Sequence, residues 1–326
     1  MSSGLFFPYG GTECETSARS GVVRGPKKPW GLRRGACRLP LIARIALGML
    51  FSHATPWTSR AVAANAEKDV LTTATDLTAG ASYLGGGTPG ATWDVTFTNA
   101  TYNATTFTVN ANLMLGTLND LNATQALIIT NTGGTNRTLT LSGGGDTVPG
   151  SASTDLIFLG ANGSLTIQNG TRTLRLALAE NGDFDTAFGA SLVINSVISG
   201  NFNLAKTGAG TLTLGGANTF GGAGKTFTLS GGTLNLNAAA ALGNAGNTFV
   251  IGGGTTIDNT SGAAITTSNY GVTINGDFTF TGGGTTTTHD LNLGTDAVTL
   301  GTTAGTTRTI TTIAANSTLR FGGVTA

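Results

Sequence analysis

Short segments that alternate in hydrophobicity and end at glycines most strongly constrain how this chain can fold, and residues 204–236 show the pattern in one place. In Thr211–Leu214 the leucines lie two residues apart, so both point to one face of a strand while the threonines point to the other. A pair of glycines ends this segment, and Thr226–Leu229 and Thr233–Leu236 repeat the alternation. None of these segments can bury much surface alone, so each must stack on a similar one.

The same pattern continues along the chain, and no segment has the period of an amphipathic helix. Glycine accounts for 51 of the 326 residues, whereas charged residues make up only 10%, against about a quarter in an average globular protein. Strands of three to five residues divided by glycines suit a solenoid better than a sandwich. We therefore expect an all-β fold, a parallel β-helix with glycine and asparagine turns. Strands are predicted at 92–97, 106–109, 155–159, 164–167, 174–178, 192–194, 248–251, 272–274, 278–280, 291–293, 298–300 and 319–321.

The chain divides by composition into a leader and a β-rich body. Residues 1–66 are predicted to be a secretory leader, because a basic region is followed by the apolar run 45–51 and then by small residues at 61–66. Residues 67–130 are predicted to form an N-terminal β segment whose aromatic content, including Trp93, caps the first coil. Residues 131–326 are predicted to be the repeat region, which stops in mid-pattern and is expected to be incomplete at its C-terminus.

Charge is distributed unevenly between these parts. Residues 1–66 carry nine of the 17 Lys and Arg residues and two of the 16 acids, so residues 67–326 have eight basic and 14 acidic residues, a net charge of −6. Nucleic acids bind to clusters of Lys and Arg that release counterions. We therefore expect no nucleic-acid partner for the body, which also lacks cysteine and hence thiolate metal sites.

Candidate catalytic and metal-binding residues are sparse. Glu180, Asp183 and Asp185 form the densest acidic group and could bind Ca²⁺ through oxygen ligands, although an exposed acidic loop is the favoured interpretation. His289 is the only histidine of the body, and Asp290 follows it directly. Neighbouring residues on a strand point to opposite faces, so this pair is not expected to form a catalytic dyad. The sequence therefore predicts no catalytic residue and no cofactor.

The central stretch resembles the autotransporter-associated β-strand repeat, which occurs in the passenger domains of secreted bacterial surface proteins. The similarity covers about a tenth of the chain, and Phe220 stands where the family usually has tyrosine. The residues that carry it are Lys206, Gly208, Gly210, Leu212, Leu214, Gly216, Asn218, Phe220, Gly232 and Leu234.

This resemblance implies a right-handed β-helical passenger that is exported from a Gram-negative-type cell, and the leader predicts that the Sec machinery exports it. The resemblance also implies that an outer-membrane barrel or a downstream anchor serves as a partner, and that a host surface or glycan is a possible target.

Each part of the motif has an expected physical role. The leucines should stack in the interior, and the glycines at 208, 210 and 216 should permit backbone angles that other residues resist. Asn218 should stack on asparagines of adjacent coils or bind the turn backbone. Lys206 is predicted to be a solvated turn residue.

Two classes of function remain open on the sequence alone. The first is a non-enzymatic structural scaffold or adhesin, and the alternative is a β-helical polysaccharide-active enzyme or glycan-binding module. Carboxylates are dispersed along the body, whereas enzymes that hydrolyse glycosidic bonds gather at least two. This favours the first class. Threonine arrays such as 285–288 suggest a further hypothesis, in which a flat face binds an ordered surface such as ice or glycan.

Overall fold

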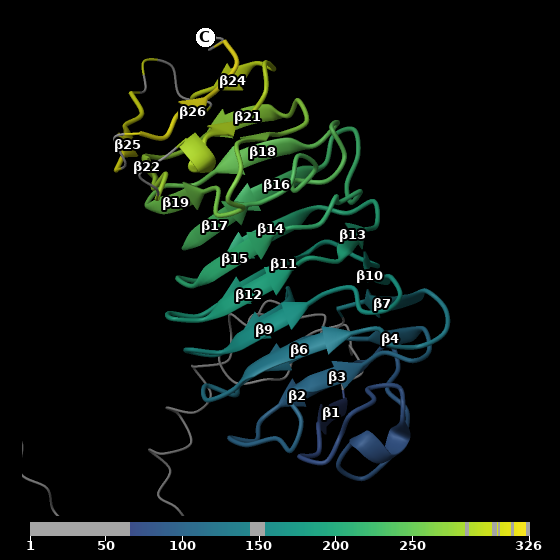
Figure 1. The fold of residues 1–326 in the computed structure, drawn as a ribbon. Helices are drawn as coiled ribbons and strands as arrows, with labels where there is room; N and C mark the ends of the chain where they lie inside the picture. The colour runs from purple at the N-terminus through teal and green to yellow at the C-terminus, as the bar shows by residue number, and fades with distance from the viewer. Residues whose placement is uncertain are drawn as a thin grey trace, which may run out of the picture. The chain divides into compact units, whose positions relative to one another are not determined.

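The computed structural model describes residues 66–143, 154–283, 287–301, 305, 307–313 and 316–323. Within these ranges the chain is an all-β parallel solenoid, in which successive coils stack along one axis and each strand pairs with the equivalent strand of the next coil (Figure 1). The expected leader lies almost entirely outside the described residues, and the first strand begins at Ala66. The prediction of a parallel β-helix is confirmed.

The longest sheet has ten strands, all of them parallel to their neighbours. Its order is β1 (Ala66–Asp69), β2 (Trp93–Phe97), β5 (Leu118–Asp120), β8 (Asp155–Leu159), β11 (Gly182–Thr186), β14 (Leu204–Thr207), β16 (Thr226–Leu229), β18 (Thr248–Ile251), β21 (Gly271–Ile274) and β24 (Val298–Thr299).

A second face of the solenoid is a nine-stranded parallel sheet. Its order is β3 (Thr106–Thr108), β6 (Ala126–Thr130), β9 (Ser164–Ile167), β12 (Ser191–Ile194), β15 (Thr211–Leu214), β17 (Thr233–Leu236), β19 (Thr255–Asp258), β22 (Phe278–Phe280) and β25 (Ile310–Thr312).

Two shorter parallel sheets complete the fold. The four-stranded sheet contains β4 (Leu113–Leu115), β7 (Arg137–Leu141), β10 (Leu174–Leu178) and β13 (Val197–Ser199). The three-stranded sheet contains β20 (Ile265–Thr266), β23 (Leu291–Asn292) and β26 (Leu319–Arg320). The helical elements in the described ranges are two single 3₁₀ turns, η1 (Gly80–Ser82) and η2 (Thr287–His289). No helix in those ranges has the length and apolar character needed to cross a bilayer.

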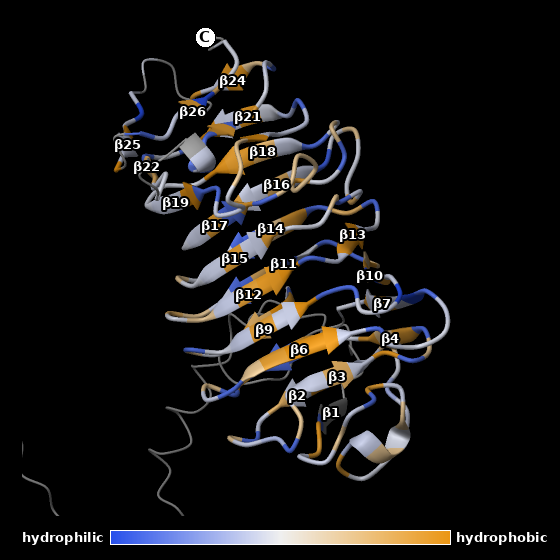
Figure 2. Ribbon diagram, viewed as in Figure 1, coloured by the Kyte–Doolittle hydropathy of each residue, from blue (hydrophilic) through white to orange (hydrophobic). Residues whose placement is uncertain are grey.

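The core consists of apolar rows that run from coil to coil. Because the strands are parallel and in register, an inward side chain on one strand lies beside the inward side chain of the next. Figure 2 shows the resulting contrast between hydrophobic strands such as β6 and β18 and more hydrophilic turns. The longest row on the nine-stranded sheet is Leu127, Leu165, Leu192, Leu212, Leu234, Ile257 and Phe280, and all are buried.

Aromatic side chains gather in the N-terminal coils. The rings of Phe97 and Phe107 meet edge to face at 4.9 Å, and Tyr102 packs edge to face on both. Trp93 is half-buried on β2, and β1 adds a further strand beyond it. The strand expected at 92–97 is therefore present as β2, while the capping role of this segment stays a prediction.

Candidate functional sites

Lys206 of the repeat motif lies inside the solenoid, so its prediction as a solvated turn residue is wrong. It is the third residue of β14, where its register partners are Phe184 on β11 and Leu229 on β16. All three side chains are fully buried. Lys206 thus occupies a position in the apolar row of the ten-stranded sheet, because alternation along β14 places it on the same face as Leu204.

The ammonium group of Lys206 binds backbone carbonyls at the end of its own strand and in the next coil. Nζ donates to the carbonyl oxygens of Thr207, Gly208 (3.0 Å) and Gly231 (3.3 Å). Burial lowers the pKa of Lys206 to about 8, while the carboxylates of Asp185 and Asp183 act in the opposite direction. The aliphatic stem therefore packs in the core and the charged end ties two consecutive coils together.

Leu212, Leu214 and Leu234 have the interior positions that their alternation predicts, and each is fully buried. Asn218 is also buried. It bridges backbones of different coils, since its Oδ1 accepts from the Ile198 amide at 2.8 Å and its Nδ2 donates to the Ala241 carbonyl at 2.7 Å. Of the two roles expected for Asn218, the structure therefore shows binding to the backbone.

The motif glycines are required for two different reasons. Gly208 has a φ of 70°, a left-handed conformation that glycine tolerates best. Gly210 and Gly216 are not among the residues with positive φ, so the expectation of unusual backbone angles is wrong for these two. A Cβ at Gly216 would lie 2.3 Å from the Ser196 carbonyl oxygen, and one at Gly210 would lie 2.4 Å from that of Ala187. Glycine is needed at both positions because the backbone there lies too close to the previous coil to leave room for a Cβ.

Asp183 and Asp185 lie on strand β11, so the interpretation of this segment as an exposed acidic loop is wrong. They share the outward face of the strand, while Phe184 between them is buried. The pKa of Asp185 is raised by burial and by the nearby Asp183 carboxylate, and Lys206 opposes the shift. Glu180 precedes the strand, and its carboxylate lies against Gly143 of another coil. In the described part of the chain, no three His, Cys, Asp or Glu side chains are placed to bind a metal.

A hollow of about 270 Å³ lies beside Asp183 on the outer face of the ten-stranded sheet. Residues of β11, β14 and β16 line it together with Asn181 and Asn203 in the preceding turns. Sequence reasoning did not find this hollow, because its residues come from consecutive coils and are separated by about one coil length in the chain.

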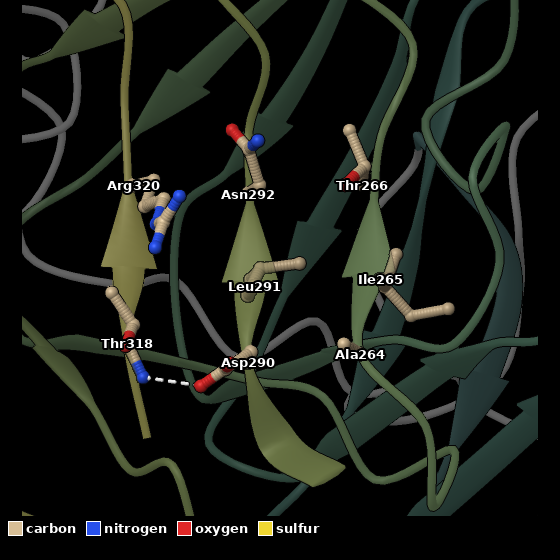
Figure 3. Close-up of a pocket in the computed structure, with 8 residues that line it drawn as sticks. All are labelled: Ala264, Ile265, Thr266, Asp290, Leu291, Asn292, Thr318 and Arg320. Atoms are coloured by element: carbon tan, nitrogen blue, oxygen red, sulfur yellow. Dashed lines mark hydrogen bonds between the residues drawn. The ribbon is translucent and has the colours of Figure 1, made fainter. Parts of the chain in front are cut away.

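The imidazole of His289 lies close to the carboxylate of Asp258, which is 31 residues earlier in the chain. The Nδ1 atom of His289 is 3.7 Å from Oδ1 of Asp258, whereas Asp290 Oδ1 accepts a hydrogen bond from the amide of Thr318 at 2.7 Å. Asp290 lines a second hollow, of about 200 Å³, on the three-stranded sheet. Figure 3 shows Thr266, Asn292 and Arg320 in one row across this sheet. The pairing of His289 with Asp258 depends on coil stacking, and no spacing in the sequence indicates it.

The outer face of the nine-stranded sheet carries an unbroken row of hydroxyl side chains on seven adjacent strands. Each member is a register partner of the next, and none is charged. Strands in a sheet lie about 4.8 Å apart, so the row repeats at that interval. The members of the row are Ser164, Ser191, Thr211, Thr233, Thr256, Thr279 and Thr311.

The threonine array expected at 285–288 is a separate segment, and its residues 285 and 286 lie outside the described residues.

In the described residues, these features combine in a β-solenoid scaffold that carries the hollows near Asp183 and Asp290 and the row of hydroxyl side chains. No family model, curated protein or solved structure matches the chain in sequence or fold comparisons.

Proposed function

We propose that this protein is a non-enzymatic β-solenoid passenger, exported through the Sec pathway, that acts as a scaffold or adhesin at the surface of a Gram-negative-type bacterium. The observation that carries the proposal is the hydroxyl row on the nine-stranded sheet. An uncharged row of this length offers a hydroxyl donor and acceptor on each of seven adjacent strands. Such a row suits contact with an extended surface better than it suits chemistry at one point.

The leader pattern and the repeat motif support the exported location. The 45–51 apolar run with small residues after it has the order of a signal peptide, and the motif resembles repeats of secreted passengers. Few charges and many small polar residues also suit a surface that is built of similar stacked coils. An outer-membrane barrel or another anchor would hold the passenger at the cell, and a host surface or glycan would be its target.

Cell fractionation tests the location. An epitope inserted after Asn244, in an exposed turn, should be accessible to antibody and protease on intact cells or be found in the medium. A matched chain without residues 45–51 should remain in the cytoplasm. Cytoplasmic retention of the complete chain would contradict the proposal.

The enzymatic alternative is tested separately. The purified chain should release no reducing sugar from a panel of plant, bacterial and host polysaccharides. Steady release that survives further purification would favour the polysaccharide-active enzyme instead.

A further inference from the structure

The hollow beside Asp183 contains a buried acceptor that the fold itself does not satisfy. Asp183 is 7% exposed, and its Oδ2 accepts from the Thr207 hydroxyl at 2.7 Å. Its Oδ1 has no hydrogen-bond partner in the described structure. Buried polar atoms are nearly always paired, because leaving one unpaired costs free energy. This oxygen therefore indicates a ligand that brings a hydrogen-bond donor into the hollow.

The rim of the hollow supplies donors that are fixed in place. Asn181 Oδ1 accepts from the Asn203 amide at 2.8 Å, and Asn203 Oδ1 accepts from the Thr226 amide at 3.0 Å. Because each side-chain oxygen is bound, each Nδ2 group is held in position and remains able to donate. The hydroxyl of Thr228 lines the same hollow and has no protein partner among the described residues. Ala205 also lines the hollow and adds a small apolar surface.

We propose that this hollow is a subsite for a neutral saccharide, with Asp183 accepting from sugar hydroxyls. A sugar ring presents hydroxyls that both donate and accept, together with apolar C–H groups, and the hollow offers a counterpart to each. The proposal rests on the adhesive function above and names the class of target.

Two other occupants fit less well. A peptide that adds a strand needs a free sheet edge, but β11 is paired on both sides, with β8 and β14. A divalent cation such as Ca²⁺ takes six to eight oxygen ligands, and no cluster of three candidate side chains surrounds this position in the described residues. The three asparagine and threonine groups on the rim are uncharged, which favours a neutral sugar over an anionic one.

Isothermal titration calorimetry on the full chain tests the subsite. The probes are neutral oligosaccharides of glucose, galactose, mannose and xylose. At least one should bind, and Asp183→Asn should weaken its binding tenfold or more. The amide can still accept from Thr207, but it turns a donor toward the hollow where an acceptor is needed. Asp296→Asn, a change at an exposed acid on the turn before β24, should bind like the unchanged protein.

A second variant keeps the test decisive if Asp183→Asn does not fold. Thr228→Val preserves side-chain shape and removes a hydroxyl that the protein does not use, so affinity should fall several-fold with an unchanged melting temperature. Three results would overturn the proposal: no binding of any oligosaccharide, binding that neither variant alters, or heat on CaCl₂ addition that Asp183→Asn abolishes. Since binding is measured on purified protein, failure of export would contradict the proposed function and leave this result standing.

Discussion

Lys206 and Phe184 are direct register partners on neighbouring strands, and both side chains are enclosed in the solenoid. A lysine therefore lies in a row whose other members between Val95 and Ile274 are aromatic or aliphatic. Its position is tolerated because three backbone carbonyls accept hydrogen bonds from the ammonium group. Burial of the charge without such partners would cost several kcal/mol, by order of magnitude.

Replacement of Lys206 should destabilise the solenoid. Lys206→Ala removes the stem from the core and leaves a cavity, and we expect a loss of about 2–4 kcal/mol, as for other large-to-small core changes. Lys206→Met refills most of the space and should lose less. Urea unfolding followed by circular dichroism measures both. Lys225→Ala, at a partly exposed turn before β16, is the matched control, and equal stability of the two alanine variants would contradict the buried position.

Asp120 should make stability depend on pH. It lies inside the solenoid as the register partner of Phe97 and Leu159, and burial raises its pKa from 3.8 to about 7. Because the folded pKa lies above the unfolded one, its contribution is fully present below pH 4 and is lost as pH rises through about 7. Each pKa unit corresponds to about 1.4 kcal/mol.

Asp120→Asn isolates this contribution from that of other acids. The variant should gain stability relative to the unchanged protein as pH rises from 4 to 7, in denaturant unfolding at each pH. A constant difference between the two proteins across this range would show that Asp120 does not titrate as expected.

Gly216 should not accept a larger residue. A Cβ there would lie 2.3 Å from the Ser196 carbonyl oxygen of the previous coil, so Gly216→Ala must move one coil away from the next. We expect a lower melting temperature, measured by differential scanning calorimetry. Gly134→Ala, where a Cβ meets nothing within 4 Å, should melt like the unchanged protein. Identical melting of the two variants would mean that coil spacing does not depend on Gly216.

The two faces of β15 should respond differently to truncation. Leu212 lies in the middle of the longest core row, so Leu212→Ala should cost about 2–5 kcal/mol. Thr211 points outward and Thr211→Ala should cost about 0.5 kcal/mol or less. Chemical denaturation of both proteins gives the comparison. Similar losses would contradict the assignment of faces.

The strands that the sequence predicts well are those in which apolar and small polar residues alternate. Residues 164–167, 211–214 and 226–229 have the predicted bounds in the structure. Strands β11 and β14 were missed because an acid or a lysine breaks the hydrophobic alternation, although the backbone alternation continues. Neighbouring coils impose the strand conformation on both, since parallel pairing satisfies the backbone whatever the side chain is.

For residues 211–236, the sequence by itself determined the strand and turn pattern and the interior positions of the leucines, and with the rest of the chain it determined the all-β solenoid. Alternation and glycine spacing are local properties, so local sequence is enough to read them. Only the tertiary structure decided that Lys206 is buried, that His289 meets Asp258 and that Asp183 lies in a hollow. Each depends on which residues of separate coils come into register, and that register is fixed by the stacking of the whole solenoid.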